Sequence, residues 1–207
     1  MANRVAGKDV ALVLVGPHPE LVSAWKAAFD PYRSRVKIHL GLFQDLLGTF
    51  DALLSPGNSY GQMDAGFDGV ISRHFPPIQR AVWDAIADRH NGYMPVGSAD
   101  VVPTGDALCP WLVYAPTMRV PMRLDGDRDV AVHDAMWAGL LAVSRHNERS
   151  PTDHRIATLA CPGLGTGVGL VPPARSAQLM AAAYELWLAG SNASILGREQ
   201  LIDRTSN

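Results

Sequence analysis

Short apolar runs rich in β-branched residues alternate along this chain with longer segments whose apolar residues recur at helical spacing. This alternation is typical of proteins in which helices pack on the faces of a largely parallel or mixed sheet. The sequence therefore predicts an α/β fold. The strand-like runs lie at 9–16, 35–40, 50–55, 99–104, 111–116 and 155–162, and the helical patterns at 17–29, 67–74, 77–90, 129–146 and 174–190.

Composition limits the classes of protein to consider. With 207 residues, 47% of them hydrophobic, the chain can bury a full core as one domain, and we expect residues 1–207 to form one, with 191–207 as a peripheral tail. The net charge of -2 gives no global positive field, so we expect no direct nucleic-acid binding. The apolar run 10–15 is too short to span a membrane. Two cysteines, Cys109 and Cys161, form no metal or disulfide pattern, and we expect two buried thiols in a cytoplasmic protein.

Two glycine-containing loops each follow a predicted strand and precede a helix. We call residues 56–65, PGNSYGQMDA, loop one, and residues 163–169, GLGTGVG, loop two. In open α/β sheets such loops meet at the carboxyl ends of the strands, where ligands bind. Loop two is neither a Walker A loop nor a dinucleotide fingerprint. Its alternating glycines allow a left-handed backbone, which we expect at Gly167. Successive backbone amides of such a loop can converge on an anion. The alternative is that these glycines only make a tight connection.

Together, the two loops resemble the macro domain family over residues of about 36–188. A family loop similar to Asn-Pro-Ala-Asn-Ser, glycines and Val-Asp-Gly is matched by SPGNSYGQMDAGFDG, with Asn58 and Asp68 at the family spacing, and Ser-Thr-Gly-Val-Phe-Gly is matched by GTGVG. The family's Gly-Asp-Ile element is matched loosely by FQDL. The resemblance implies a three-layer α/β/α macro-like domain with a central mixed sheet. It also implies ADP-ribose, or an ADP-ribosylated molecule, as the partner.

The resemblance assigns a task to each part of the ligand. Asp45 would accept a hydrogen bond from the adenine amine, although it could equally be an exposed acid or a helix cap. Asn58 would contact the distal ribose, with an Asx turn as its alternative. The amides of loop two would hold the diphosphate. The implied ligand-binding residues are Asp45, Leu46, Ser55, Gly57, Asn58, Ser59, Tyr60, Gly66, Phe67, Gly163, Leu164, Gly165, Thr166, Gly167, Val168 and Gly169.

The resemblance implies catalysis by Asn58 and Asp68. In family hydrolases the acid that matches Asp68 positions or activates the attacking water, whereas its structural alternative is a first-turn helix acid. No lysine follows Lys37, so water is the expected nucleophile, and no histidine spacing predicts a metal or cofactor site. Loop one also carries Asp64 in place of a family glycine, which can change the substrate.

Two other functions remain open beside hydrolysis of an ADP-ribosyl ester or small conjugate. The protein could be a reader that binds ADP-ribose without turnover, or a scaffold module in a larger assembly. The oligomeric state is not predicted. The strand and helix before residue 36 could add a sheet edge or form a partner surface.

Overall fold

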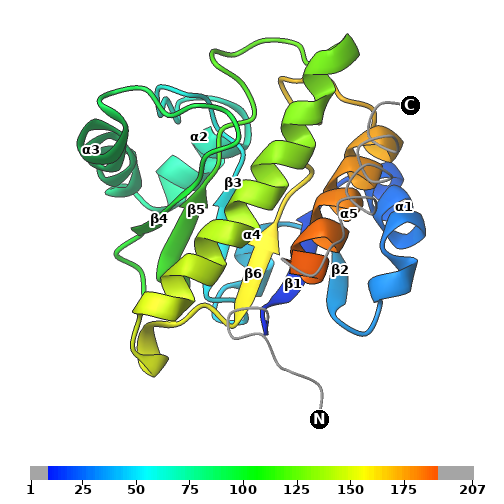
Figure 1. The fold of residues 1–207 in the computed structure, drawn as a ribbon, viewed down its shortest axis with the longest axis horizontal. Coiled ribbons are helices and arrows are strands. Elements are labelled where there is room, and N and C mark those ends of the chain that lie inside the picture. Colours follow the sequence, from blue (N-terminus) through cyan, green and yellow to red (C-terminus); the bar gives the residue numbers. More distant parts are fainter. Residues whose placement is uncertain (1–8, 191–207) are drawn as a thin grey trace.

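The computed structural model describes residues 9–190 and contains a six-stranded sheet covered by helices on both faces (Figure 1). Its strands coincide with the six apolar runs of the sequence, because β-branched and aliphatic side chains pack well on a pleated, buried surface. The strands are β1 (Ala11–Gly16), β2 (Val36–Leu40), β3 (Ala52–Ser55), β4 (Asp100–Pro103), β5 (Trp111–Tyr114) and β6 (Thr158–Cys161).

The strand order is β2-β1-β6-β3-β5-β4, and only β4 runs antiparallel to its neighbour, β5. The sheet is therefore mixed, and the predicted α/β class is confirmed. The parallel strands share one direction, so their carboxyl ends lie at one edge of the sheet. Loop one follows β3 and loop two follows β6, which are paired neighbours.

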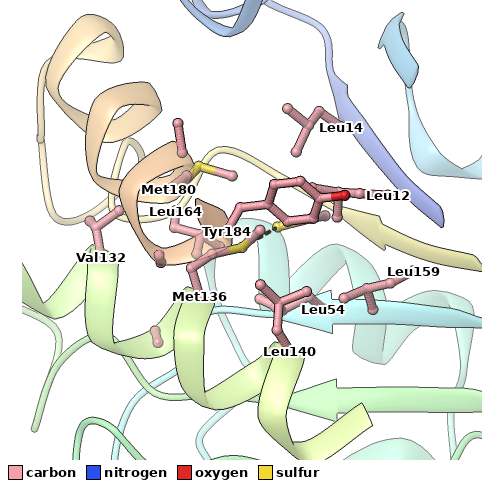
Figure 2. Close-up of a cluster of buried hydrophobic side chains, with 14 of the residues drawn as sticks. Leu12, Leu14, Leu54, Val132, Met136, Leu140, Leu159, Leu164, Met180 and Tyr184 are labelled. Carbon is pink, nitrogen blue, oxygen red and sulfur yellow. Dashed lines mark hydrogen bonds between the residues drawn. The ribbon is translucent and has the colours of Figure 1, made fainter. Parts of the chain in front are cut away.

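The helices are α1 (Pro19–Ala28), α2 (Gly66–His74), α3 (Ile78–His90), α4 (Ala131–Arg149) and α5 (Pro173–Ala189), with short 3-10 turns at η1 (Asp30–Tyr32), η2 (Phe43–Leu46), η3 (Gly126–Val130) and η4 (Thr152–His154). They divide between two cores. On one face α1, α4 and α5 bury Leu54 and its neighbours, and Figure 2 shows Met136, Met180 and Tyr184 packed there. On the other face α2 and α3 cover Leu53. Alternate strand residues thus enter opposite cores, which gives the predicted three layers.

The N-terminal strand does not form a sheet edge. β1 pairs with β2 on one side and with β6 on the other, and its residues Leu12–Val15 are buried. Helix α1 packs against α5 beside it (Figure 1). Within residues 9–35, β1 therefore lies inside the sheet and contributes side chains to both cores, and α1 packs in the core that contains Leu54.

The remaining expectations on composition have mixed outcomes. Cys109 and Cys161 are buried free thiols, and burial raises the pKa of each. Within residues 9–190, no helix is both long enough and apolar enough to cross a bilayer. The predicted peripheral tail, 191–207, lies outside the described residues.

Candidate functional site

Loop one and loop two meet at the carboxyl edge of the sheet and enclose a cavity of about 120 Å³. Its walls come from loop one, the first turn of α2, loop two and the segment that follows β5. A cavity of this size holds one sugar-sized group rather than a whole dinucleotide, since drug-sized ligands fill roughly 300–1,000 Å³. The lining residues are Pro56, Gly57, Asn58, Gln62, Asp64, Ala65, Gly66, Phe67, Asp68, Thr117, Met118, Pro121, Gly163, Gly165, Gly167, Val168 and Gly169.

Asp68 is the buried acid of this cavity. It lies in the first turn of α2, only 9% exposed, and its Oδ1 accepts a hydrogen bond of 2.6 Å from the hydroxyl of Ser55, the last residue of β3. Burial raises the pKa of Asp68 to about 6, and the Ser55 hydrogen bond opposes this rise. The carboxylate therefore changes charge near neutral pH, as expected of a proton acceptor in catalysis.

Asn58 lines the cavity, but much of its side chain organises loop one. Its Oδ1 accepts from the backbone N–H groups of Tyr60 at 3.1 Å and Gln62 at 3.4 Å, and its Nδ2 donates to the Gln62 carbonyl at 2.8 Å. The contact with Tyr60 is the Asx turn that the sequence offered as an alternative. An amide nitrogen carries two hydrogens, so one donor of Asn58 remains for a ligand.

Tyr114, at the end of β5, fixes the backbone of loop one at Asn58. Its buried hydroxyl donates to the Asn58 carbonyl at 2.8 Å and accepts from the Asn58 N–H at 3.0 Å. A Cβ on Gly57 would collide with this hydroxyl, so the glycine is required by close approach of the ring. Burial, followed by the nearby charge of Asp68, raises the pKa of Tyr114, so the phenol stays protonated and keeps both bonds.

The glycines of loop two have different roles. Gly165 has a φ of 71°, and a Cβ on Gly169 would lie 2.5 Å from the Gly165 carbonyl oxygen. Gly167 does not adopt the left-handed backbone that we expected, and a Cβ there would meet nothing within 4 Å. Gly165 and Gly169 are thus needed for the turn itself, whereas Gly167 leaves open space at the cavity.

Two backbone N–H groups of loop two have no acceptor within residues 9–190. In the part of the chain that the structure describes, the N–H groups of Gly167 and Val168 donate to no protein acceptor, while those of Leu170 and Val171 bond to Gly167 and Gly165. Leu170 also has a φ of 54°, an uncommon conformation for a side-chain-bearing residue. Free amides beside a cavity are what an anion-binding loop requires.

Ten of the residues singled out in the sequence lie together on the cavity wall. Both proposed catalytic residues are among them, together with the glycines of both loops. The two loops thus meet at one cavity, as the sequence pattern predicted. The ten are Gly57, Asn58, Gly66, Phe67, Asp68, Gly163, Gly165, Gly167, Val168 and Gly169.

Seven others do not line the cavity. The Ser55 hydroxyl donates a hydrogen bond to the Asp68 carboxylate. Asp45 is exposed and accepts a hydrogen bond from the Leu42 N–H at 2.9 Å, which is the helix-cap alternative. Thr166 donates to the Gly163 carbonyl at 3.0 Å. The other four pack in a core or on the surface: Leu46, Ser59, Tyr60 and Leu164.

The sequence reading missed the segment after β5. Thr117 donates its N–H to the Gly57 carbonyl at 3.0 Å and its hydroxyl to the Pro56 carbonyl at 3.1 Å, and Met118 bridges to Asn58. A signal existed, since β5 is a parallel strand that ends at the same edge. From loop one, Gln62 was missed as a wall residue, whereas Asp64, which the sequence indicated as able to change the substrate, does line the cavity. In the described range, no group of three or more His, Cys, Asp or Glu side chains could hold a metal ion.

A protein-family model, described as the Macro domain, matches residues 55–180, which is more than half of the chain. The chain belongs to the macro domain family. The matched segment of this macro domain begins at Ser55 and ends inside α5, so it includes both loops.

Solved macrodomain structures share the fold. The macrodomain of Mycobacterium tuberculosis DarG is 23% identical, with a TM-score of 0.53 over 66% of this chain and 82% of that chain. An Oceanobacillus iheyensis macrodomain with ADP is 14% identical, with a TM-score of 0.54 over 69% and 72%. Thermosipho africanus DarTG, in complex with ADP-ribose, is 16% identical, with a TM-score of 0.54 over 83% and 49%. At these identities the likeness concerns the fold.

The glycines of loop two give a stability prediction. Gly169→Ala forces a Cβ against the Gly165 carbonyl and should lower the free energy of unfolding by about 1 to 3 kcal/mol. Gly167→Ala, facing open space, should change it by no more than about 0.5 kcal/mol. Urea denaturation of both variants measures the difference. Equal losses would contradict the assigned roles.

Asp68 gives a prediction on pH and stability. Its folded pKa of about 6 lies above the ordinary aspartate value of 3.8. Asp68 therefore stabilises the fold least above pH 6, where the buried carboxylate is charged. Asp68→Asn keeps an acceptor for Ser55 and should raise the free energy of unfolding at pH 7.5 by about 1 to 3 kcal/mol. The gain should shrink as pH falls through 6 toward 4. Denaturation at several pH values measures it, and a gain independent of pH would contradict burial as the cause.

Proposed function

We propose that this macro domain binds ADP-ribose and hydrolyses an ADP-ribosyl bond, in an ester or a small conjugate, with water as the nucleophile. The observation that carries the proposal is that the buried Asp68 lines the same cavity as Gly167 and Val168, whose N–H groups have no acceptor within residues 9–190. A base and an anion cradle thus share one cavity. Support also comes from the family match, which covers both loops.

The size of the cavity suggests how ADP-ribose would lie. About 120 Å³ suits the distal ribose, next to Asn58 and Asp68, and the diphosphate would then lie along Gly167 and Val168. Val168 is 48% exposed and approaches the start of α2 at Gly66, so the two loops would separate when the larger ligand enters. The adenine would extend beyond this cavity, and Asp45 remains its predicted partner.

The reaction needs a proton acceptor next to the attacked carbon. Above pH 6 Asp68 is mostly ionised and can accept a proton from a water molecule as that water attacks C1″ or the attached acyl carbon. The bond to the leaving group breaks, and that group takes up a proton. Ser55 fixes the carboxylate in place through its 2.6 Å hydrogen bond, and loop two amides hold the diphosphate so that the scissile bond stays in reach.

A reader without turnover is the second candidate. The observation that favours it is that Asn58 spends most of its hydrogen-bonding capacity within loop one, which leaves little to orient a water molecule. In that case Asp68 would only accept a hydrogen bond from a ribose hydroxyl. Binding is common to both candidates, and turnover separates them.

Binding gives the first functional prediction. ADP-ribose at a hundredfold excess over Kd should stabilise the fold by about 2.7 kcal/mol, and AMP should do less. Gly167→Glu should abolish the effect, since it places a bulky negative charge where the diphosphate would lie. Gly167→Gln, of similar size but neutral, should lose less affinity, and Gly167→Ala should retain most of it. Thermal denaturation and calorimetry measure these effects; unchanged affinity in Gly167→Glu would mean that the phosphates bind elsewhere.

Turnover gives the second. Asp68→Asn should lower the hydrolysis rate of an ester-linked ADP-ribose by about 10² to 10⁴ and leave Kd for ADP-ribose nearly unchanged. In the wild-type protein kcat should rise with pH through about 6 and then level off, because Asp68 must be ionised. Asp64→Asn is the matched control, since Asp64 is an exposed acid on the same wall. Its kcat should change less than about tenfold.

The outcome that contradicts hydrolysis is specific. If the wild-type protein binds ADP-ribose but turns over no ester-linked, glycosidic or phosphorylated ADP-ribose substrate, the reader function stands instead. If kcat falls equally in Asp68→Asn and Asp64→Asn, the negative charge of the cavity matters rather than a positioned base.

A further inference from the structure

A second hollow of this protein lies away from the loops. A groove of about 730 Å³ is lined by the C-terminal end of α3, the start of the edge strand β4 with the residues before it, and one side of α4. None of the residues that line it lines the loop cavity. The groove is therefore a separate feature, which binding of ADP-ribose does not explain.

One wall of the groove offers unpaired backbone groups. β4 is the last strand of the sheet and pairs only with β5. The Thr104 N–H donates to the Pro110 carbonyl. In an antiparallel ladder every second residue is hydrogen-bonded to the neighbouring strand. The backbone groups of Val102 therefore point toward β5, and those of Val101 point away from it. The N–H and C=O of Val101, which lines the groove, are thus available to an added strand.

The opposite wall is a stripe of α4 that is apolar at one end and basic at the other. Trp137, Leu141, Arg145 and Arg149 recur at intervals of four residues and therefore share one helix face. Trp137 packs on the core and also lines the groove. An occupant would meet apolar surface first and cations farther along the helix.

The charges of the groove are unbalanced. Its acid, Asp100, already pairs with Arg89 at 3.3 Å and His90 at 3.0 Å. Arg145 and Arg149 are exposed and form no ion pair with any residue in 9–190. Two uncompensated guanidinium groups on a chain of net charge -2 select for an occupant with carboxylates.

We propose that this groove binds an extended acidic segment of a partner protein, which adds to β4 as a further strand. The backbone of the segment would bond to Val101, its apolar side chains would contact Trp137 and Leu141, and its carboxylates would reach Arg145 and Arg149. Pro103 has no N–H and ends the available edge, so the added strand is short and pairs with the start of β4.

Two variants of the full chain test the proposal. The probe is a fluorescent peptide of about six residues, the usual length of a strand, with alternating valine and threonine and glutamate at its last two positions. Reversing both charges, Arg145→Glu with Arg149→Glu, should weaken its binding by at least about tenfold. Lys26→Glu with Lys37→Glu is the matched control, because it changes the net charge equally at the opposite edge of the sheet and should leave Kd unchanged.

The second variant tests the strand pairing. Val101→Pro removes the outward N–H without breaking a bond to β5, and it should also weaken binding; hydrogen exchange of the Val101 amide in the wild-type protein should slow when the peptide is present. The proposal is overturned if the peptide does not bind, if a version with lysine for glutamate binds as well, or if inorganic phosphate displaces the peptide fully. It is also overturned if sedimentation shows that the free protein dimerises and the charge reversal disrupts the dimer, since a second copy would then occupy the groove.

Discussion

The hydrogen bond from Ser55 to Asp68 joins the end of β3 to the start of α2 and fixes the geometry of the site. The segment between them is loop one, so this 2.6 Å contact sets both ends of the loop. A carboxylate buried in this way is unfavourable when ionised, and one short hydrogen bond offsets only part of that cost. The ionised Asp68 carboxylate therefore lowers the stability of the fold at the place where the chemistry is proposed.

The remainder of loop one is held by groups remote in the sequence. Gln79 accepts from the Met63 N–H at 2.9 Å and donates to the Gly61 carbonyl at 2.6 Å, while Tyr114 bonds to both backbone groups of Asn58. Loop two is held mainly by its own backbone and by the Ser176 hydroxyl, which donates to the Leu164 carbonyl at 2.7 Å. One loop is thus fixed by many side chains, while the other keeps free amides at its tip.

Local pattern predicted the elements well because each periodic run also buries one face in a core. It placed Asp68 in the first turn of a helix and both loops at one edge of the sheet. It could not identify Tyr114, whose contact with Asn58 spans 56 residues. It also gave Gly167 a left-handed backbone, which Gly165 and Leu170 adopt instead. Whether a glycine is required by the turn, as Gly169 is, or only borders open space, as Gly167 does, depends on its neighbours in three dimensions. The position of β1 inside the sheet was likewise fixed by pairing with β6, which lies about 150 residues later.

The most direct test of this account is the titration of the Asp68 carboxyl itself. Carbon-13 NMR of the side-chain carboxyl, assigned by comparison with Asp68→Asn, should give a midpoint of about 6 in the free protein, because the group is buried. The same resonance should shift on addition of ADP-ribose, since the distal ribose would contact it. A midpoint near 3.8, or a resonance that saturating ADP-ribose leaves unmoved, would contradict the claim that Asp68 is the buried base of an ADP-ribose site.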